Sequence, residues 1–359
     1  MARRKQGWSK IAKERDERKE RLITIVGPTA VGKSRVAFRQ AQLLDTEIIT
    51  ADSMQIYKGM DIGTDKPKQE EREAVKHHLV DEVDVSKEYS VATYQKRARS
   101  IISDINEQDK LPILVGGTGL YVRAVIDRLI FSPETAPSQI RENLARESLG
   151  GSLLRQAQAF GSEVFDREAQ TESAQARRDG ELCRTIFEEL ASLDPEAAEK
   201  IGPGNTRRVI RALEVIKVTG KPFSSFQGEW PKRDSIYDLL FFGLTLPREE
   251  LYQRIEERVD SMLSAGLLEE TRTLLRSGGL SLTAKQALGY RQIVEYLEGK
   301  RNWGETVALI KTKTRQYAKR QLTWFRADPR IVWIDLTQDE PVSFICQKVK
   351  ERWGIVCRG

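Results

Sequence analysis

The sequence is poor in the residues that commonly cross-link proteins or bind structural metals, with only three cysteines and two histidines among 359 residues. Cys183, Cys346 and Cys357 lie far apart and suggest no disulfide framework, which is typical of a reducing cytoplasm. His77 and His78 are adjacent and no Cys-x-x-Cys pair accompanies them, so the chain has too few ligands for a zinc finger. We therefore expect a cytoplasmic protein without structural zinc.

Long hydrophobic runs are also missing. The apolar stretch Leu239–Leu246 is far too short to span a bilayer, and Met1–Leu22 lacks the apolar core of a signal peptide. A hydrophobic content of 39% with 31% charged residues describes a globular protein, long enough for one large domain or two modest ones. We expect no association with a membrane.

Acidic residues are absent from one long basic segment. Lys311–Arg326 carries six basic residues and no acidic one, and Met1–Arg21 carries nine basic against four acidic residues. The overall net charge is only +6, so the positive charge is concentrated in patches. Such patches favour a polyanionic partner, although the mixed charges at the N-terminus are typical of a loosely ordered extension.

The most informative pattern present is a phosphate-binding loop. The motif G-x-x-x-x-G-K-[ST] is filled by Gly27, Gly32, Lys33 and Ser34, between an apolar run and a helical pattern. Its backbone amides can surround phosphate oxygens, Lys33 can neutralise the terminal phosphates, and the Ser34 hydroxyl can hold Mg²⁺. The expected phosphate contacts are Gly27, Pro28, Thr29, Ala30, Val31, Gly32, Lys33 and Ser34. The loop predicts a phosphorylated ligand without identifying it.

Apolar runs rich in β-branched residues alternate with helical patterns along most of the chain. This alternation predicts an α/β fold, a P-loop NTPase-like, mostly parallel sheet flanked by helices. The expected strands are Leu22–Val26, Glu47–Ala51, Leu111–Val115, Tyr237–Leu246 and Arg330–Leu336. The expected later helices are Arg207–Thr219, Pro247–Ser277, Lys285–Glu298 and Glu305–Arg326.

One long segment lacks strand patterns. Residues 133–203 are rich in Glu, Arg, Ala, Gln and Leu, and proline- and glycine-containing segments bracket them, so we predict a helical insertion domain. The remaining divisions are a basic extension at 1–21 and a P-loop α/β body formed by 22–132 and 204–359, which ends in helices.

Two further strand ends carry residues suited to chemistry. Asp52 can hold magnesium-bound water, act as a general base, or simply cap a turn. Ser53 and Gln55 have side chains that can read the edge of a nucleobase. The turn Gly116–Gly119 can reach the same ligand through its amides or Thr118, or serve only for packing. Since ligands bind at the carboxyl ends of parallel strands, we expect these turns to converge on one crevice.

Several arginines have helical spacing that allows two interpretations. Arg208 and Arg211 share a helix face that can grip phosphates or form surface ion pairs, and the same holds for Arg254 and Arg258 near Glu257. Two more segments, 285–292 and 314–326, mix cations with aromatic and amide groups. Such mixtures can position an RNA backbone and stack unpaired bases.

Taken in order, these motifs resemble those of the tRNA dimethylallyltransferases, the IPP transferase family. The resemblance rests on residues 27–34, 52–67, 115–121, 207–215, 288–292 and 314–326. It runs from about Leu22 to Arg326, and departs from the family in the basic tail and in an insertion that is longer than usual. The zinc finger of eukaryotic members is absent, which indicates a bacterial type.

The resemblance implies transfer of a dimethylallyl group to N6 of the adenosine immediately 3′ of a tRNA anticodon. It assigns the loop to the diphosphate of dimethylallyl diphosphate rather than to ATP, with Arg254, Arg258 and Mg²⁺ assisting. Asp52 matches the base, and Lys33 and Thr118 complete the catalytic set. The implied tRNA contacts are Asp52, Ser53, Met54, Gln55, Thr118, Arg207, Arg208, Arg211, Gln286, Gly289, Tyr290, Arg291, Arg315, Lys319 and Arg320. We expect a monomer.

Three alternatives remain open from the sequence. A phosphotransferase would use the loop for ATP, but would have no need for the basic, aromatic region at 285–326. An adenylate isopentenyltransferase would share the first three motifs and act on a free nucleotide. An RNA-binding module with a vestigial loop is disfavoured because Lys33, Ser34 and Asp52 are all present.

Overall fold

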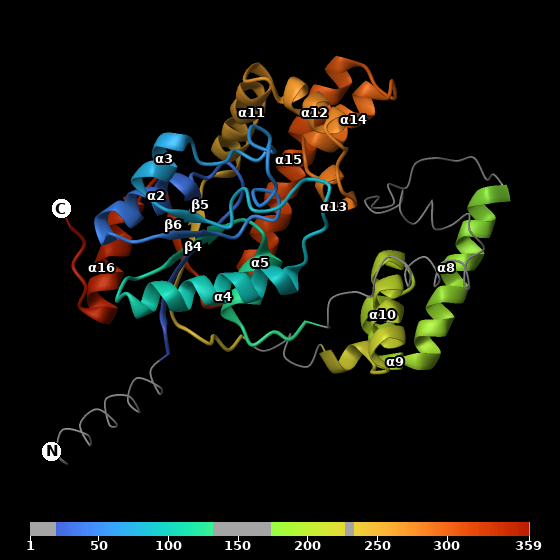
Figure 1. Ribbon diagram of the computed structural model, residues 1–359, viewed down its shortest axis with the longest axis horizontal. Coiled ribbons are helices and arrows are strands. Elements are labelled where there is room, and N and C mark those ends of the chain that lie inside the picture. Colours follow the sequence, from blue (N-terminus) through green and yellow to red (C-terminus); the bar gives the residue numbers. More distant parts are fainter. Residues whose placement is uncertain (1–18, 132–173, 227–232, 359) are drawn as a thin grey trace, which may run out of the picture. The chain divides into compact units, whose positions relative to one another are not determined.

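The computed structural model describes residues 19–131, 174–226 and 233–358 (Figure 1). The chain divides into a main unit, Met1–Arg128 with Arg233–Gly359, and a second unit, Leu129–Lys232. The predicted extension, apart from its last residues, and much of the predicted insertion lie outside the described residues.

The main unit is built on a six-stranded parallel sheet with the order β3-β2-β4-β1-β5-β6. Its strands are β1 (Arg21–Val26), β2 (Ile48–Thr50), β3 (His77–His78), β4 (Ile113–Gly116), β5 (Asp238–Thr245) and β6 (Val332–Asp335). The predicted parallel α/β sheet is confirmed. The edge strand β3 was not predicted, because two residues are too few to show a periodicity.

Ten helices of the described residues belong to the main unit. They are α2 (Lys33–Leu44), α3 (Gln69–Ala74), α4 (Val91–Glu107), α5 (Gly119–Ile126), α11 (Arg248–Ser264), α12 (Leu267–Arg276), α13 (Leu282–Lys285), α14 (Tyr290–Leu297), α15 (Trp303–Arg326) and α16 (Pro341–Trp353). The two helices predicted at Pro247–Ser277 and Lys285–Glu298 are each broken into two. The breaks fall at Gly266 and Gly289, whose φ values of 103° and 90° lie in the region that glycine tolerates.

Successive residues of the central strand β1 point to opposite faces of the sheet, and each face has its own core. Leu22 and Val26 pack into the core that includes residues of α4 and α5. Ile23 and Ile25 pack into the core that includes residues of α2, α11 and α16. Burial on both faces explains why β1 is a continuous apolar run rather than an alternating one.

The second unit consists of helices in its described part. These are α8 (Ala174–Leu193), α9 (Pro195–Ile201), α10 (Thr206–Thr219) and the short 3₁₀ helix η2 (Phe223–Phe226). The sequence analysis placed α10 in the body, but Val209 and Ala212 pack in one apolar cluster with Leu190 of α8 and Ala197 of α9. That shared core places the helix in the second unit.

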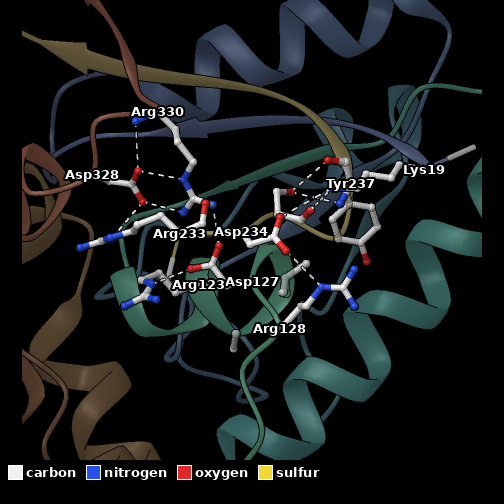
Figure 2. Close-up of polar contacts among 12 residues, drawn as sticks. Lys19, Arg123, Asp127, Arg128, Arg233, Asp234, Tyr237, Asp328 and Arg330 are labelled. Carbon is white, nitrogen blue, oxygen red and sulfur yellow. Dashed lines mark hydrogen bonds and ion pairs between the residues drawn. The ribbon is translucent and has the colours of Figure 1, made fainter. Parts of the chain in front are cut away.

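The chain leaves the main unit after α5 and returns ahead of β5 along a neighbouring path. The Ile236 amide donates to the Ile126 carbonyl at 2.9 Å, and Asp127 pairs antiparallel with Ser235. Lys19 and Arg128 add surface ion pairs to Asp234 at 3.8 and 3.3 Å (Figure 2).

A largely buried ionic cluster lies next to the two segments by which the chain leaves and re-enters the main unit (Figure 2). The Asp127 carboxylate, 1% exposed, accepts hydrogen bonds from Arg123 and Arg330, each at 2.7 Å. Asp328 accepts from Arg330 at 2.7 Å and from Arg233 at 3.0 Å. The cluster thereby ties the exit and the return of the chain to the loop before β6.

The prediction of no disulfide is wrong for one cysteine pair. Cys346 of α16 and Cys357 are bonded, with their Cα atoms 5.9 Å apart. The tail can turn back because α16 ends at Gly354, whose φ is 69°, and the Arg358 amide then donates to the Leu43 carbonyl of α2. No helix in the described ranges is both long and apolar enough to cross a membrane.

Candidate active site

The phosphate loop joins the carboxyl end of β1 to the first turn of α2. Gly27 adopts a φ of 150°, and a Cβ there would overlap the Leu244 carbonyl oxygen of β5. Gly32, with a φ of 103°, caps α2 in a left-handed conformation. The pattern in the sequence thus has the strand, tight turn and helix start that phosphate binding requires.

Lys33 is the cation at the centre of this loop. Its ammonium donates to the Pro28 carbonyl at 2.7 Å. Burial lowers the pKa of Lys33 to about 7, and the nearby positive charge of Arg258 lowers it further, while Asp52 and Asp65 partly offset these effects. This lysine therefore titrates near neutral pH in the environment formed by the protein alone.

Binding of inorganic diphosphate is expected to take up a proton at Lys33 above pH 7. An anion favours the charged ammonium and raises its pKa, so the contribution of Lys33 to the affinity is fully present well below pH 7 and falls as the pH rises through 7. The limiting slope is about one decade per pH unit. Calorimetric titrations at pH 8 in two buffers of different ionisation enthalpy measure this uptake.

The control is Lys33→Met, in which ionisation of the diphosphate itself still occurs but the contribution of the lysine is gone. Equal proton uptake by the wild type and this variant would show that Lys33 is already charged in the free protein.

Arg258 of α11 lies closer to the loop than its predicted companion Arg254. Arg258 contacts Asp65 at 3.2 Å and exerts its charge on Lys33. Arg254 is paired with Glu250 of its own helix at 2.7 Å. The structure therefore brings Arg258 to the site, whereas the Arg254 side chain is paired with a residue of its own helix. Asp65 was not singled out, although it lies within the 52–67 motif.

Asp52 follows β2, next to the turn that follows β4. Its Oδ1 accepts hydrogen bonds from the amides of Met54 at 2.8 Å and Gln55 at 3.4 Å. The Thr118 amide donates to the Ala51 carbonyl at 3.2 Å, and the Thr118 hydroxyl accepts from the Ser53 amide at 3.2 Å. The predicted convergence of these strand ends is confirmed for the Asp52 and Thr118 turns.

Gln55 is engaged by its own segment, and its predicted reading of a base stays a prediction. Its side-chain amide donates to the backbone carbonyls of Thr64 at 3.0 Å and Asp65 at 3.3 Å. Gln55 thus closes the 52–67 segment on itself and holds Asp65 in place. Its amide nitrogen is thus engaged by backbone carbonyls.

Tyr290 is not available to a large ligand, and its assignment as a tRNA contact is corrected. The side chain is fully buried, and its hydroxyl donates to Glu270 at 2.5 Å. Glu270 in turn accepts the amides of Asp61, Ile62 and Gly63 at 3.1, 2.8 and 3.3 Å. Tyr290 supports the 52–67 segment from behind.

The other residues of the 285–292 segment have mixed environments. Gly289 is buried at the start of α14, and its amide donates to Gln292 at 2.8 Å. Gln286 has a buried Oε1 without a hydrogen-bond partner among the described residues. Arg291 is half-buried and pairs with Glu295 at 3.2 Å.

The predicted basic contacts on α15 differ in their exposure. Arg315 is paired with Glu256 and lies 5.9 Å from the centre of the Tyr252 ring. Lys319 and Arg320 are exposed. Arg315 is therefore paired with a residue of α11. Lys319 and Arg320, about one turn further along α15, carry positive charges that are exposed.

The remaining predicted arginines belong to the second unit. Arg208 is exposed on α10, and Arg211 pairs with Glu214 at 3.3 Å. The side chain of Arg207 lies outside the described residues.

A magnesium site would depend on few protein ligands. Ser34 is exposed in the first turn of α2, directly after Lys33. Within the described ranges no group of three or more His, Cys, Asp and Glu side chains is arranged for a metal ion. Mg²⁺ commonly binds through one or two side chains, substrate phosphates and water, so a single hydroxyl fits such a site.

A bridge from α15 was not foreseen from the sequence. The buried side chain of Gln321 contacts both Thr29 of the phosphate loop, at 2.8 Å, and Gly117, at 2.9 Å. A Cβ on Gly117 would overlap this amide, and one on Gly119 would overlap the Trp324 ring. Gly117 and Gly119 are thus required by the close approach of α15.

Comparison with known proteins gives a consistent family relationship. The family model described as IPP transferase matches residues 55–328. A tRNA dimethylallyltransferase of Carboxydothermus hydrogenoformans is 46% identical over 336 residues, covering 94% of this chain and 98% of the relative. One of Geobacillus thermodenitrificans is 43% identical, covering 92% and 95%.

Solved structures agree with these relatives. The full-length tRNA isopentenylpyrophosphate transferase of Bacillus halodurans matches with a TM-score of 0.61 and 38% identity, over 93% of this chain and 98% of that one. A eukaryotic dimethylallyltransferase acting on tRNA matches with a TM-score of 0.71 and 29% identity, over 95% and 81%.

Proposed function

The chain belongs to the IPP transferase family, and we propose that it transfers the dimethylallyl group of dimethylallyl diphosphate to a tRNA adenosine. The acceptor is N6 of the adenosine immediately 3′ of the anticodon, and diphosphate is released. The observation that carries the proposal is the meeting of a phosphate loop with the Asp52 and Thr118 turns at the carboxyl edge of the sheet.

The phosphate loop is suited to the leaving group. As the bond between the allylic carbon and the diphosphate oxygen breaks, negative charge develops on the diphosphate. We assign the stabilisation of this charge to the loop amides, to Lys33 and to Arg258, whose own charge acts on Lys33. The Ser34 hydroxyl would hold Mg²⁺, which neutralises phosphate charge when bound.

Asp52 is suited to the acceptor. The N6 lone pair of adenine is delocalised into the ring, so the nitrogen is a poor nucleophile unless its proton is removed as the new C–N bond forms. The amides of Met54 and Gln55 hold Oδ1 and orient the carboxylate. The proton of N6 passes to Asp52, and Thr118 fixes the neighbouring turn. Access of a stacked adenosine requires that the base be flipped out of the anticodon loop.

The direct test is incubation with labelled dimethylallyl diphosphate and Mg²⁺. We expect label on an anticodon stem-loop containing three consecutive adenosines, with one diphosphate released per base modified. Free AMP, offered at the same concentration, should remain unlabelled. Label on AMP alone would indicate a cytokinin-type enzyme, and RNA-independent ATP hydrolysis without prenyl transfer would indicate a phosphotransferase.

RNA binding is expected to depend on the exposed end of α15. Replacing Lys319 and Arg320 by alanine should weaken stem-loop binding and reduce the slope of log affinity against log salt by roughly 0.7–0.9 for each phosphate that the protein no longer neutralises. Arg315→Ala should have a smaller effect on the slope, because Arg315 is paired with Glu256. Filter binding at several salt concentrations measures this, with diphosphate affinity as the control.

An equal loss of RNA and diphosphate affinity in the double variant would indicate misfolding. An unchanged salt slope would place the RNA contacts elsewhere.

We further propose that the enzyme acts in the cytoplasm as a monomer, in keeping with its tRNA substrate and with a site drawn from one chain.

A further inference from the structure

Gln321 connects two loops that are far apart in the sequence. Its side chain is 6% exposed on α15. Oε1 accepts the Thr29 amide at 2.8 Å, and Nε2 donates to the Gly117 carbonyl at 2.9 Å. The backbone partners determine which end of the amide is oxygen, since one is a donor and the other an acceptor.

One end of this bridge contacts the loop assigned to the diphosphate, and the other contacts the turn next to the proposed base. Thr29 lies in the loop assigned to the leaving diphosphate. Gly117 immediately precedes Thr118, whose hydroxyl accepts the Ser53 amide next to Asp52. The bridge therefore connects the loop assigned to the leaving group with the turn beside the base. Since the Thr29 amide is occupied by Gln321, the later loop amides remain for the ligand.

A second polar side chain lies near the bridge on the same helix face. The hydroxyl of Tyr317, one turn before Gln321, is close enough to Thr118 and Gln321 for both side chains to lower its pKa. Burial raises the pKa of Tyr317 to about 12, so the hydroxyl stays protonated at neutral pH. Gly117 leaves no room for adjustment, because any side chain there would overlap the Gln321 amide.

We propose that Gln321 is a positioning residue for prenyl transfer, holding the diphosphate loop and the adenosine-side turn at the spacing that the reaction needs. This inference rests on the proposed function. A displacement of about 1 Å between reacting groups can lower a rate about 100-fold while binding is largely retained. Loss of Gln321 should therefore lower the rate of the chemical step more than either affinity.

The test compares Gln321→Leu with Thr314→Val. Thr314 is also buried on α15, but its hydroxyl donates only within the helix, to the Ile310 carbonyl at 2.7 Å. At saturating substrates, we expect Gln321→Leu to lower the single-turnover rate roughly 10–100-fold. Both dissociation constants should change by less than about threefold, well short of a full decade. Thr314→Val should retain the wild-type rate.

Gln321→Glu provides a second variant if the leucine variant is poorly folded. Its carboxylate can accept from Thr29 but cannot donate to Gly117, so half of the bridge is lost. Its rate should also fall. Equal rates for the Gln321 and Thr314 variants, or a loss confined to affinity, would overturn the inference while leaving the proposed function intact.

Hydrogen exchange tests the bridge independently of any activity. Peptides that contain residues 27–34 and 115–121 should both exchange faster in Gln321→Leu than in the wild type, and neither should in Thr314→Val. Unchanged exchange in both peptides would overturn the bridging role. Absence of prenyl transfer by the wild-type enzyme would instead refute the proposed function.

Discussion

Asp52→Asn is expected to lower the single-turnover rate of prenyl transfer about 10²–10⁴-fold, the usual contribution of a positioned general base. The amide has nearly the shape of the carboxylate and can keep an oxygen facing the amides of Met54 and Gln55. It cannot take the N6 proton at neutral pH. Affinities for the diphosphate and the RNA should therefore stay within a few-fold of wild type. Rapid-quench measurement with saturating enzyme isolates this step from product release.

The matched control is Asp65→Asn, which removes another carboxylate whose charge acts on Lys33. Asp65 is paired with Arg258, so its loss should alter diphosphate binding more than the chemical step. If both asparagine variants lost the same fraction of the single-turnover rate, general electrostatics rather than proton transfer would explain the effect. A wild-type rate for Asp52→Asn would remove Asp52 from the role of base.

Asp127→Ala is expected to reduce the free energy of unfolding by about 3 kcal/mol, the order measured when one partner of a buried ion pair is removed. Asp127 is 1% exposed and accepts from Arg123 and Arg330, in a cluster that also contains Arg233. Its loss removes the carboxylate that accepts from Arg123 and leaves Arg233 and Arg330 with Asp328 as their remaining carboxylate in the cluster (Figure 2). Chemical denaturation monitored by tryptophan fluorescence measures the change.

Asp234→Ala is the control for this prediction. Asp234 belongs to the same crossing of the chain, but its side chain is 59% exposed and its pairs with Lys19 and Arg128 lie at the surface. Exposed pairs contribute at most about 1 kcal/mol. Similar losses in the two variants would show that the crossing depends on surface charge rather than on the buried cluster.

The phosphate loop and β1 are the features that the sequence predicts most directly. Gly27, Gly32 and Lys33 define a local backbone shape, and the apolar run before them defines a strand buried on both faces. These features depend on residues within about one turn of each other, so the pattern alone predicts them. Asp52 and Thr118 could be placed near the loop because parallel strands end at the same edge.

Features that depend on partners far away in the sequence could not be predicted from local patterns. The pairing of Cys346 with Cys357 requires the turn at Gly354 and the packing of the tail on α2, and the burial of Tyr290 requires Glu270 and the 60–64 backbone. The membership of α10 in the second unit depends on which helices share its apolar face. A hydrophobic pattern shows that a face is buried, but not against which element.

The sequence by itself therefore determined the parallel sheet, the phosphate loop, the family and the acidic and hydroxyl groups available for chemistry. Only the tertiary structure decided that Gln321 joins the two sides of the site, that Arg258 rather than Arg254 faces the loop, and that Arg315 is engaged by Glu256. The reason is that local patterns constrain backbone conformation within a segment. A contact between a side chain and backbone groups more than 200 residues away, such as those of Gln321, depends on how complete elements pack.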